Sequence, residues 1–314
     1  MTATTRPQRW HAAFSHEEVQ ELVRMQDWRS GVTLIVDWGL ILGALLVAGS
    51  WPHPLTILAA GVVIGTRQLG LAVIMHEAAH RSFLSNRKLN DGVGRWLACY
   101  PIWSDLDSYR DYHIRHHTRT WTDEDPDKHL ATPFPVTRES FRRKVTRDLS
   151  GKTGLKFLGF ALQRDLGVEG SWAERLRVGF TRPAFRGMLI TNGALLAGVC
   201  LAGKPWLYLL WLGSYLTWNT LVTRIRSIAE HSMSPDPSDE MLQTRTTLAR
   251  PWERLLIAPN RVNYHLEHHL LMTVPHYNLP RMHRMLRERG LLEDALVARG
   301  YLGVLRDATS APNT

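Results

Sequence analysis

The sequence predicts an all-α integral membrane protein, a four-helix bundle made of two transmembrane hairpins beneath a helical cap. Two observations carry this prediction. Apolar segments of membrane length occur in pairs, and basic residues are concentrated away from the short links within each pair. The mean hydropathy of −0.20 and the 21% of charged residues would suit a soluble protein. Because these averages combine very different segments, the segments themselves are more informative.

Four apolar stretches come close to the ~20 residues that cross a bilayer as a helix. They are residues 31–50, 55–75, 187–202 and 205–223. Only Trp51–Pro54 joins the first pair and only Gly203–Lys204 the second, so each pair is expected to form a hairpin. Pro205 suits the first turn of the fourth helix, where a missing backbone N–H costs no hydrogen bond.

Basic residues fix the expected orientation of these spans. The hairpin links hold one such residue, Lys204, whereas the segment from Arg81 to Arg186 and the C-terminal third are rich in arginine. By the positive-inside rule, both termini and the middle segment face the cytoplasm. Arginine accounts for 32 of the 38 basic residues, which is typical of a GC-rich bacterial source and points to the inner membrane. The net charge of +9 does not indicate nucleic-acid binding, because the basic residues do not alternate with aromatic ones.

The expected domain organisation has three parts. They are a cytoplasmic or interfacial N-terminal segment (1–30), a membrane domain (31–290) whose cytoplasmic cap comprises residues 76–186 and 224–290, and a C-terminal tail (291–314). In the first part, Ser15 and Glu18 form a capping box that opens a helix running to about Trp28. Residues 138–186 mix basic and apolar groups and are expected to form interfacial helices. The end of the chain from Asp307 is expected to be disordered.

Two charged residues lie inside the predicted spans. Asp37 is six residues into the first span and Arg67 is nine residues before His76. At 1.5 Å per residue their depths agree within roughly 5 Å, so a buried ion pair is expected. The pair can be purely structural or can line a substrate cavity.

Histidine is concentrated in short strings on the predicted cytoplasmic side. The strings are HEAAH (His76, His80), HIRHH (His113, His116, His117), AEH (His231) and HLEHH (His265, His268, His269). With 15 histidines in 314 residues, the pattern His-x-x-His-His is expected about 0.03 times per chain by chance, yet it occurs twice. Histidines three and four residues apart share one face of a helix, so each string can direct its imidazoles to one place.

These imidazoles predict a metal centre. Neutral imidazole binds iron, copper, zinc and nickel, and since one ion rarely takes more than about six ligands, nine imidazoles indicate two ions. Iron best suits the activation of oxygen against an unreactive C–H bond, and a membrane bundle would give it access to lipid chains. The histidines outside the strings are expected on the surface or in ordinary packing: His11, His16, His53, His129, His276 and His283.

In this order, and separated by the predicted spans, HEAAH, HIRHH and NYHLEHH resemble the histidine boxes of the membrane fatty acid desaturase superfamily. The resemblance covers about residues 30–290 and includes the segment VPHYNLPRMHRML after the third box. It implies an oxygen-dependent oxidoreductase with two non-haem irons and a lipophilic substrate such as an acyl lipid or acyl thioester. The implied iron ligands are His76, His80, His113, His116, His117, His231, His265, His268 and His269. Some relatives have an asparagine one turn before the extra ligand His231, where this chain has Ser227.

Acidic residues beside the boxes are candidates for fixing the imidazole tautomers through hydrogen bonds. They are Glu77, Glu230 and Glu267, together with Asp123, Asp125 and Asp127 after the second box. The sequence contains no His-Pro-Gly-Gly string, no Gly-x-Gly-x-x-Gly and no cysteine cluster, so we expect electrons from an external ferredoxin or small cytochrome. Arg224, Arg226 and Arg261 could contact an acidic carrier or the headgroups of membrane lipids.

Other functions remain open at this stage. HEAAH also matches the zinc metalloprotease pattern His-Glu-x-x-His, with Glu77 as the base, although this use leaves the other strings without a role. A membrane protein could also bind metal without catalysis. Lipid hydroxylation and carotenoid ketolation or hydroxylation share the di-iron site, and the run TWTDEDPDKHL is similar to a stretch of carotenoid ketolases. Fatty acyl desaturation is preferred, because NYHLEHH and its flank are most similar to lipid desaturases.

Overall fold

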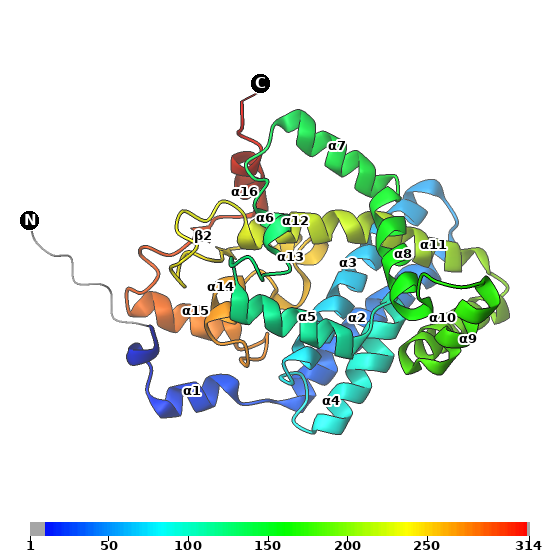
Figure 1. Cartoon of the computed structure of the whole chain (residues 1–314), viewed down its shortest axis with the longest axis horizontal. Coiled ribbons are helices and arrows are strands. Elements are labelled where there is room, and N and C mark those ends of the chain that lie inside the picture. Colours follow the sequence, from blue (N-terminus) through cyan, green and yellow to red (C-terminus); the bar gives the residue numbers. More distant parts are fainter. Residues whose placement is uncertain (1–9, 313–314) are drawn as a thin grey trace, which may run out of the picture.

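The computed structural model describes residues 10–312, and these are mostly helical (Figure 1). The first hairpin consists of α2 (Asp27–Ser50) and α3 (Pro54–Ala79). The second consists of α10 (Pro183–Leu201) and α11 (Trp206–Ser214). The expectation of an all-α chain holds apart from one parallel pair of two-residue strands, β1 (Thr246–Thr247) and β2 (Val297–Ala298).

The other elements are shorter and surround the hairpins. The α-helices are α1 (His16–Val23), α4 (Arg87–Val93), α5 (Leu106–Arg119), α6 (Lys128–Ala131), α7 (Arg138–Leu149), α8 (Lys152–Leu166), α9 (Trp172–Thr181), α12 (Thr220–His231), α13 (Pro251–Leu256), α14 (His265–Leu270), α15 (Leu279–Glu288) and α16 (Tyr301–Ala308). Three short 3₁₀ turns are η1 (Trp10–Ala13), η3 (Tyr100–Ile102) and η5 (Pro259–Arg261). Two further turns, η2 (Gly94–Cys99) and η4 (Tyr215–Asn219), are π-helical.

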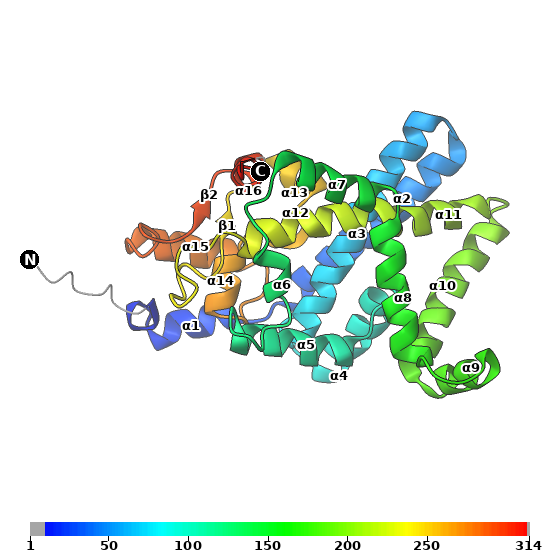
Figure 2. The same ribbon diagram turned by 45° about the horizontal axis from the view of Figure 1, so that its top comes forward.

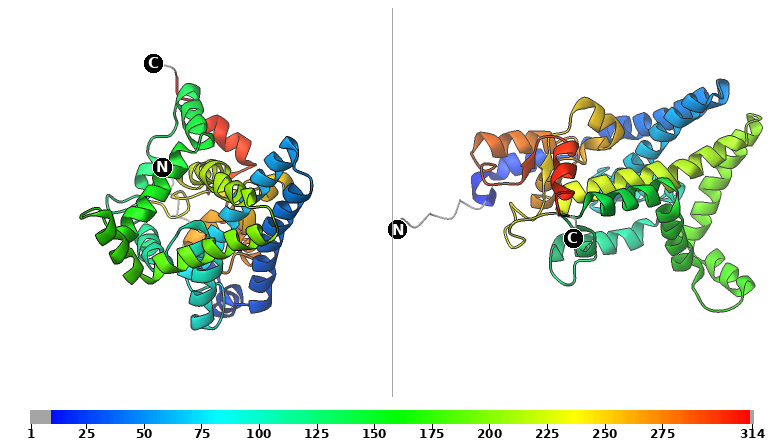
Figure 3. Two further views of the ribbon diagram at one scale, coloured as in Figure 1. Left: turned by 90° about the vertical axis from the view of Figure 1, so that its right-hand side faces the viewer. Right: turned by 90° about the horizontal axis from the view of Figure 1, so that it is seen from above.

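Three helices, α2, α3 and α10, contain apolar segments long enough to cross a membrane. The fourth predicted span contains a π turn: α11, η4 and α12 follow one another without a gap, with helical backbone angles at both junctions, and the helix continues to His231. The tips of both hairpins point the same way, and α1, α14 and α15 lie towards the opposite end (Figure 3). The three helices confirm membrane-length spans, whereas a bundle of four spans stays a prediction.

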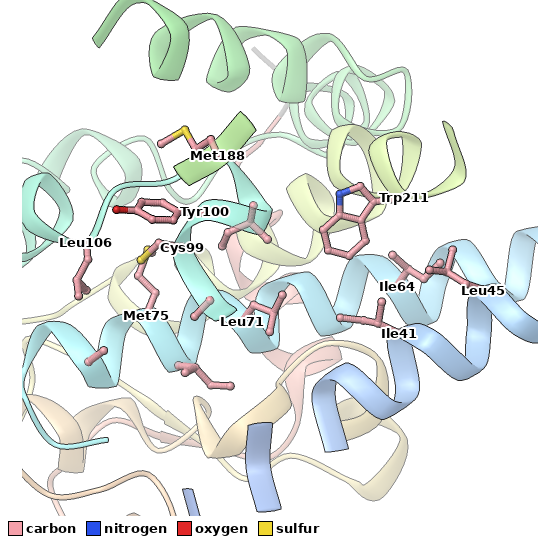
Figure 4. Packing of buried hydrophobic residues seen from close by; sticks show 14 of the residues in the cluster. Ile41, Leu45, Ile64, Leu71, Met75, Cys99, Tyr100, Leu106, Met188 and Trp211 are labelled. Atoms are coloured by element: carbon pink, nitrogen blue, oxygen red, sulfur yellow. The ribbon is translucent and has the colours of Figure 1, made fainter. Parts of the chain in front are cut away.

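Helix α3 is the centre of the fold and contacts α2, α5, α11 and α12 (Figure 2). Its apolar side chains Ile64, Leu71 and Met75 belong to a buried cluster with Tyr100 and Trp211 from neighbouring segments (Figure 4). Because α3 is covered on several sides, its sequence is apolar around most of its circumference rather than along one stripe.

The predicted ion pair inside the hairpin is confirmed. Arg67 Nη1 lies 3.1 Å from Asp37 Oδ1, and both side chains are buried. Asp37 Oδ2 accepts a hydrogen bond from Asn260 Nδ2 at 2.6 Å, and Arg67 Nη2 donates to the carbonyl oxygen of Leu255 at 3.0 Å. The charges therefore satisfy each other while they fasten α2 and α3 to the C-terminal segment, and Arg67 also lines a cavity beside α2.

The N-terminal helix is shorter than predicted. The capping box is present, with Glu18 N donating to Ser15 Oγ at 3.2 Å and Ser15 N donating to Glu18 Oε2 at 2.9 Å. The helix nevertheless ends at Val23, because Gln26 N donates to the hydroxyl of Tyr277 at 2.6 Å and the chain turns there before α2 begins. Residues 1–9 of the expected N-terminal segment lie outside the described residues.

The C-terminal segment also differs from the tail that the sequence suggested. Strand β2 pairs with β1, and α16 packs against α12 with Tyr301 and Val304 buried. Asp307, which we expected to be disordered, lies within α16. The helix is held at its start because Tyr301 N donates to Glu253 Oε1 at 2.8 Å. Residues 313–314 lie outside the described residues.

Helix α8 approaches the π turn η4 too closely for a side chain at Gly154. A Cβ there would lie 2.4 Å from the carbonyl oxygen of Leu216, a backbone atom that cannot rotate away. We predict that Gly154→Ala lowers the free energy of unfolding by about 1–3 kcal/mol, the usual cost of overpacking. Thermal unfolding of the detergent-solubilised protein measures this loss.

Gly159 in the same helix provides the matched control, since a Cβ there would meet no atom within 4 Å. Gly159→Ala should leave the unfolding midpoint unchanged or raise it, because alanine favours a helix more than glycine does. An equal loss in both variants would contradict the close approach of α8 to η4.

Candidate metal centre

Four elements bring the histidine strings to one end of α3. The string residues are distributed as follows: His76 lies in α3 and His80 at its C-terminus; His113, His116 and His117 lie in α5; His231 ends α12; and His265, His268 and His269 lie in α14. These segments are far apart in the sequence, so the convergence is a product of the tertiary fold. All nine imidazoles have at least one neighbouring imidazole from another element.

The nine histidines form two clusters. The five-histidine cluster contains His76, His80, His113, His117 and His268, and the four-histidine cluster contains His116, His231, His265 and His269. Within each cluster, one ring nitrogen from every member lies within 4.8 Å of the others. The clusters adjoin, with the rings of His117 and His269 stacked at a centroid distance of 4.2 Å.

Helical spacing explains how each His-x-x-His-His string serves both clusters. In α5 the outer pair His113 and His117 joins the five-histidine cluster, while His116 joins the other. In α14 the outer pair His265 and His269 joins the four-histidine cluster, while His268 crosses to the first. Residues four apart are neighbours on one helix face, and the remaining histidine is rotated away from that face.

Several ring nitrogens of the two clusters face one another at hydrogen-bond distance. Nε2 of His265 lies 2.8 Å from Nε2 of His231, and Nε2 of His117 lies 2.9 Å from that of His268 and 3.1 Å from that of His113. Two facing ring nitrogens can share only one proton, and His117 has two such neighbours. Further buried ring nitrogens have no hydrogen-bond partner among the described residues: His76 Nδ1, both nitrogens of His80, His268 Nδ1 and His269 Nε2. Unused lone pairs at this density fit a pair of metal ions.

Burial favours the neutral form of several of these imidazoles. It lowers the pKa of His80 to about 3, with the charge of Arg110 adding to the effect, and the pKa of His117 to about 2, with His80 as the next cause. Burial likewise places the pKa values of His268 and His269 well below the ordinary value. Since metals bind the neutral ring, the clusters need not lose protons before they bind an ion near neutral pH.

Two arginines that the sequence did not single out hold the histidine-bearing helices in place. Arg110 of α5 donates to two backbone carbonyls at the C-terminus of α3, each at 3.0 Å, and pairs with Asp91 at 2.7 Å. Arg245 donates to two carbonyls around the end of α12, beside His231, each at 3.0 Å. Both place positive charge at the C-terminus of a helix, where it is favoured. No local sequence pattern marks these contacts, because they join distant segments.

The aspartates after the second box occupy different positions. Asp125 Oδ1 lies 2.8 Å from Nδ1 of His116, and its other oxygen accepts a hydrogen bond from the backbone. Asp127 Oδ2 is farther from the same ring nitrogen, at 3.8 Å. Asp123 instead pairs with Lys128 at 2.7 Å and is fully exposed. Asp125 is therefore the aspartate that can hold the His116 ring so that its Nε2 is free for a metal.

A match to known proteins now adds to this geometry. Residues 50–300 match the family model described as fatty acid desaturase. The chain belongs to the fatty acid desaturase family. The two histidine clusters are consistent with the di-metal site typical of that family.

Three curated relatives show the range of similarity. The dihydrorhizobitoxine desaturase of Bradyrhizobium elkanii is 26% identical over 280 residues, which are 85% of this chain and 78% of that protein. The sn-1 oleoyl-lipid 12-desaturase of Anabaena variabilis is 26% identical over 271 residues, 82% and 75% of the two chains. The chloroplastic omega-6 fatty acid desaturase of Brassica napus is 26% identical over 289 residues, 87% of this chain but 62% of that protein. The match thus spans less than two thirds of the length of this plant relative.

The glutamates of this desaturase-family site have different partners. Glu230 Oε1 lies 3.5 Å from Nδ1 of His265 and has no hydrogen-bond partner among the described residues, while Oε2 accepts from Arg226 Nε at 2.8 Å. Glu77 contacts no string histidine and instead accepts from the backbone N–H of His276 at 3.0 Å. The His276 ring adds a second contact, because its Nδ1 lies 3.1 Å from Glu77 Oε2.

Glu267, like Glu77, contacts a histidine of the segment after the third box. Glu267 Oε1 lies 2.6 Å from Nδ1 of His283, and Thr246 Oγ1 donates to its other oxygen. His283 and His276 are buried, and we expected them only on the surface or in ordinary packing. The signal available in the sequence was the segment VPHYNLPRMHRML itself, which supplies both histidines directly after the third box. His276 and His283 thus contact Glu77 and Glu267, the glutamates of the first and third strings.

We predict that Asp125→Asn weakens metal binding at the four-histidine cluster by about 10- to 100-fold, the usual effect of removing a carboxylate that orients a ligand. The iron content of purified protein should fall from two atoms per chain towards one. Metal analysis by inductively coupled plasma mass spectrometry measures this change.

Asp123→Asn is the control, because this aspartate is fully exposed and pairs with Lys128 rather than with a histidine. It should retain the wild-type iron content. Full iron occupancy in Asp125→Asn, or an equal loss in both variants, would contradict the role given to Asp125.

Proposed function

We propose that this protein is an oxygen-dependent di-iron desaturase that introduces a C=C bond into the fatty acyl chain of a lipid. Four spans anchor it in a bacterial inner membrane with the metal centre on the cytoplasmic side. The observation that carries the proposal is the pair of adjoining histidine clusters at the end of membrane-length helices. Membership of the desaturase family and the names of the lipid-desaturase relatives support the choice of reaction and substrate.

The proposed ligands are the nine string histidines, five for one iron and four for the other. Two irons held there would supply the oxidising power, by using O₂ against an unreactive C–H bond. The reaction removes one hydrogen from each of two adjacent methylenes. With two further electrons and two protons from outside, O₂ is reduced to two molecules of water.

The chain's own residues prepare the site for this chemistry. Asp125 holds the His116 ring, and the two arginines Arg110 and Arg245 set the ends of the helices that carry the ligands. Tyr109 stacks on His113 with a centroid distance of 5.2 Å and an interplanar angle of 10°, which restricts the rotation of that ring. Rigid placement of this kind is what a metal site needs for a defined coordination geometry.

The electrons come from an external donor of the ferredoxin or small-cytochrome class. This part of the proposal is supported by the absence of a haem, dinucleotide or iron–sulfur motif from the sequence. The substrate reaches the irons from the membrane, because the clusters lie at the end of α3, a helix of membrane length.

The metalloprotease alternative is disfavoured by the contacts of Glu77. A protease of this type uses the glutamate of His-Glu-x-x-His as a base at the zinc-bound water. Here Glu77 binds His276, and both histidines of the string belong to a cluster with three further imidazoles. Hydroxylation of a lipid and ketolation or hydroxylation of a carotenoid use the same donor set and are distinguished by product analysis.

Expression in a host with simple lipids, followed by profiling of acyl chains and pigments, tests the proposal. We predict new unsaturated acyl chains that disappear in His268→Ala, which removes a ligand while α14 and the spans remain. His129→Ala, at an exposed histidine that contacts only a backbone carbonyl, should retain the product. Modified carotenoids with unchanged acyl chains would overturn the substrate, and full turnover by His268→Ala would overturn the ligand assignment.

A further inference from the structure

A cavity lies beside the first hairpin, separate from the histidine clusters. It has a volume of about 530 Å³ and is bordered by α2, by α13 with the turn η5, and by the segment around His276. None of the nine string histidines lines it. The cavity is therefore not part of the proposed iron site.

Three arginines line this cavity without a carboxylate partner among residues 10–312: Arg29, Arg254 and Arg261. Arg224 and Arg226, which the sequence also offers as contacts for a carrier or for headgroups, already have carboxylate partners. Arg224 pairs with Asp148 at 2.5 Å and Arg226 with Glu230 at 2.8 Å. The cavity therefore carries positive charge that no carboxylate of the described residues balances, and it fits an anion.

One wall of the cavity is apolar and belongs to a helix of membrane length. Val32, Val36 and Leu40 of α2 line it and are 50%, 46% and 37% exposed. Trp28 and Leu255 are also exposed at this cavity, and a tryptophan at such a position suits the membrane interface. The arginines and the apolar wall therefore lie side by side, as do the charged headgroup and the acyl chains of a phospholipid.

The backbone that presents Arg261 is held in an uncommon conformation. Asn260 and Arg261 have φ angles of 52° and 62°, two consecutive left-handed residues that are not glycine. Asn260 Nδ2 holds the turn by donating to Asp37 Oδ2 at 2.6 Å and to the carbonyl oxygen of Gly70 at 3.1 Å. Strained turns that the surrounding structure holds in place are concentrated at ligand sites.

We propose that this cavity binds an anionic phospholipid, with the phosphate of its headgroup at Arg29, Arg254 and Arg261 and one acyl chain along Val32, Val36 and Leu40. Basic pockets between membrane helices bind such headgroups through charge and hydrogen bonds. The lipid is a bound component of the protein rather than its substrate, because the cavity does not include the histidine clusters. The proposal is independent of the reaction that the metal centre performs.

Native mass spectrometry of the full chain in a mild detergent tests this binding, with phosphatidylglycerol and phosphatidylcholine as probes. The wild type should retain phosphatidylglycerol in preference. Arg254→Gln combined with Arg261→Gln should weaken that binding by about 30-fold, which corresponds to about 1 kcal/mol for each arginine. Val36→Asn should also weaken it, although the charge of the site is unchanged.

Arg284→Gln combined with Arg287→Gln removes the same charge from exposed positions of α15 outside the cavity, and it should leave lipid retention unchanged. An unchanged iron content in the cavity variants reports that they are folded. Equal binding of the two lipids by the wild type would overturn the proposal even without the variants. Equal losses in the cavity and control variants would also overturn it, as would full displacement of phosphatidylglycerol by equimolar glycerol phosphate, which would assign the cavity to a soluble anion.

Discussion

The constraint on which the structure depends is the close packing of nine buried or half-buried imidazoles, several of whose ring nitrogens face each other. A buried polar atom without a partner costs about 1–3 kcal/mol, and this site contains several of them. Such an arrangement is stable only if the rest of the fold holds the rings in place or if metal ions use their lone pairs. The elements around the site are consistent with both.

The supports of the site come from every part of the chain. Arg110 and Arg245 fix the ends of two histidine-bearing helices, and Asp125 fixes the ring of His116. Behind the first and third strings, Glu77 and Glu267 bind two histidines of the segment that follows the third box. The Asp37–Arg67 pair then joins this C-terminal segment to the first hairpin, so contacts connect the histidine clusters with the helices of membrane length.

The sequence alone predicted the parts that depend on local pattern. Apolar length identified the helices α2, α3 and α10, and the His-x-x-His-His spacing identified the residues that converge. Contacts between distant segments could not be predicted in this way: Asp123 and Asp125 are two residues apart, yet one is exposed and the other is buried against His116. The π turn η4 and the docking of α16 likewise depend on tertiary packing, which neither hydrophobic periodicity nor composition records.

Iron K-edge X-ray absorption of the purified protein tests the central claim most directly, because it reports the atoms bound to the metal. The account predicts a coordination sphere dominated by nitrogen, with the outer-shell scattering of four or five imidazoles per iron, as the two clusters would provide. A sphere dominated by oxygen or sulfur, or one with a single imidazole per iron, would contradict it.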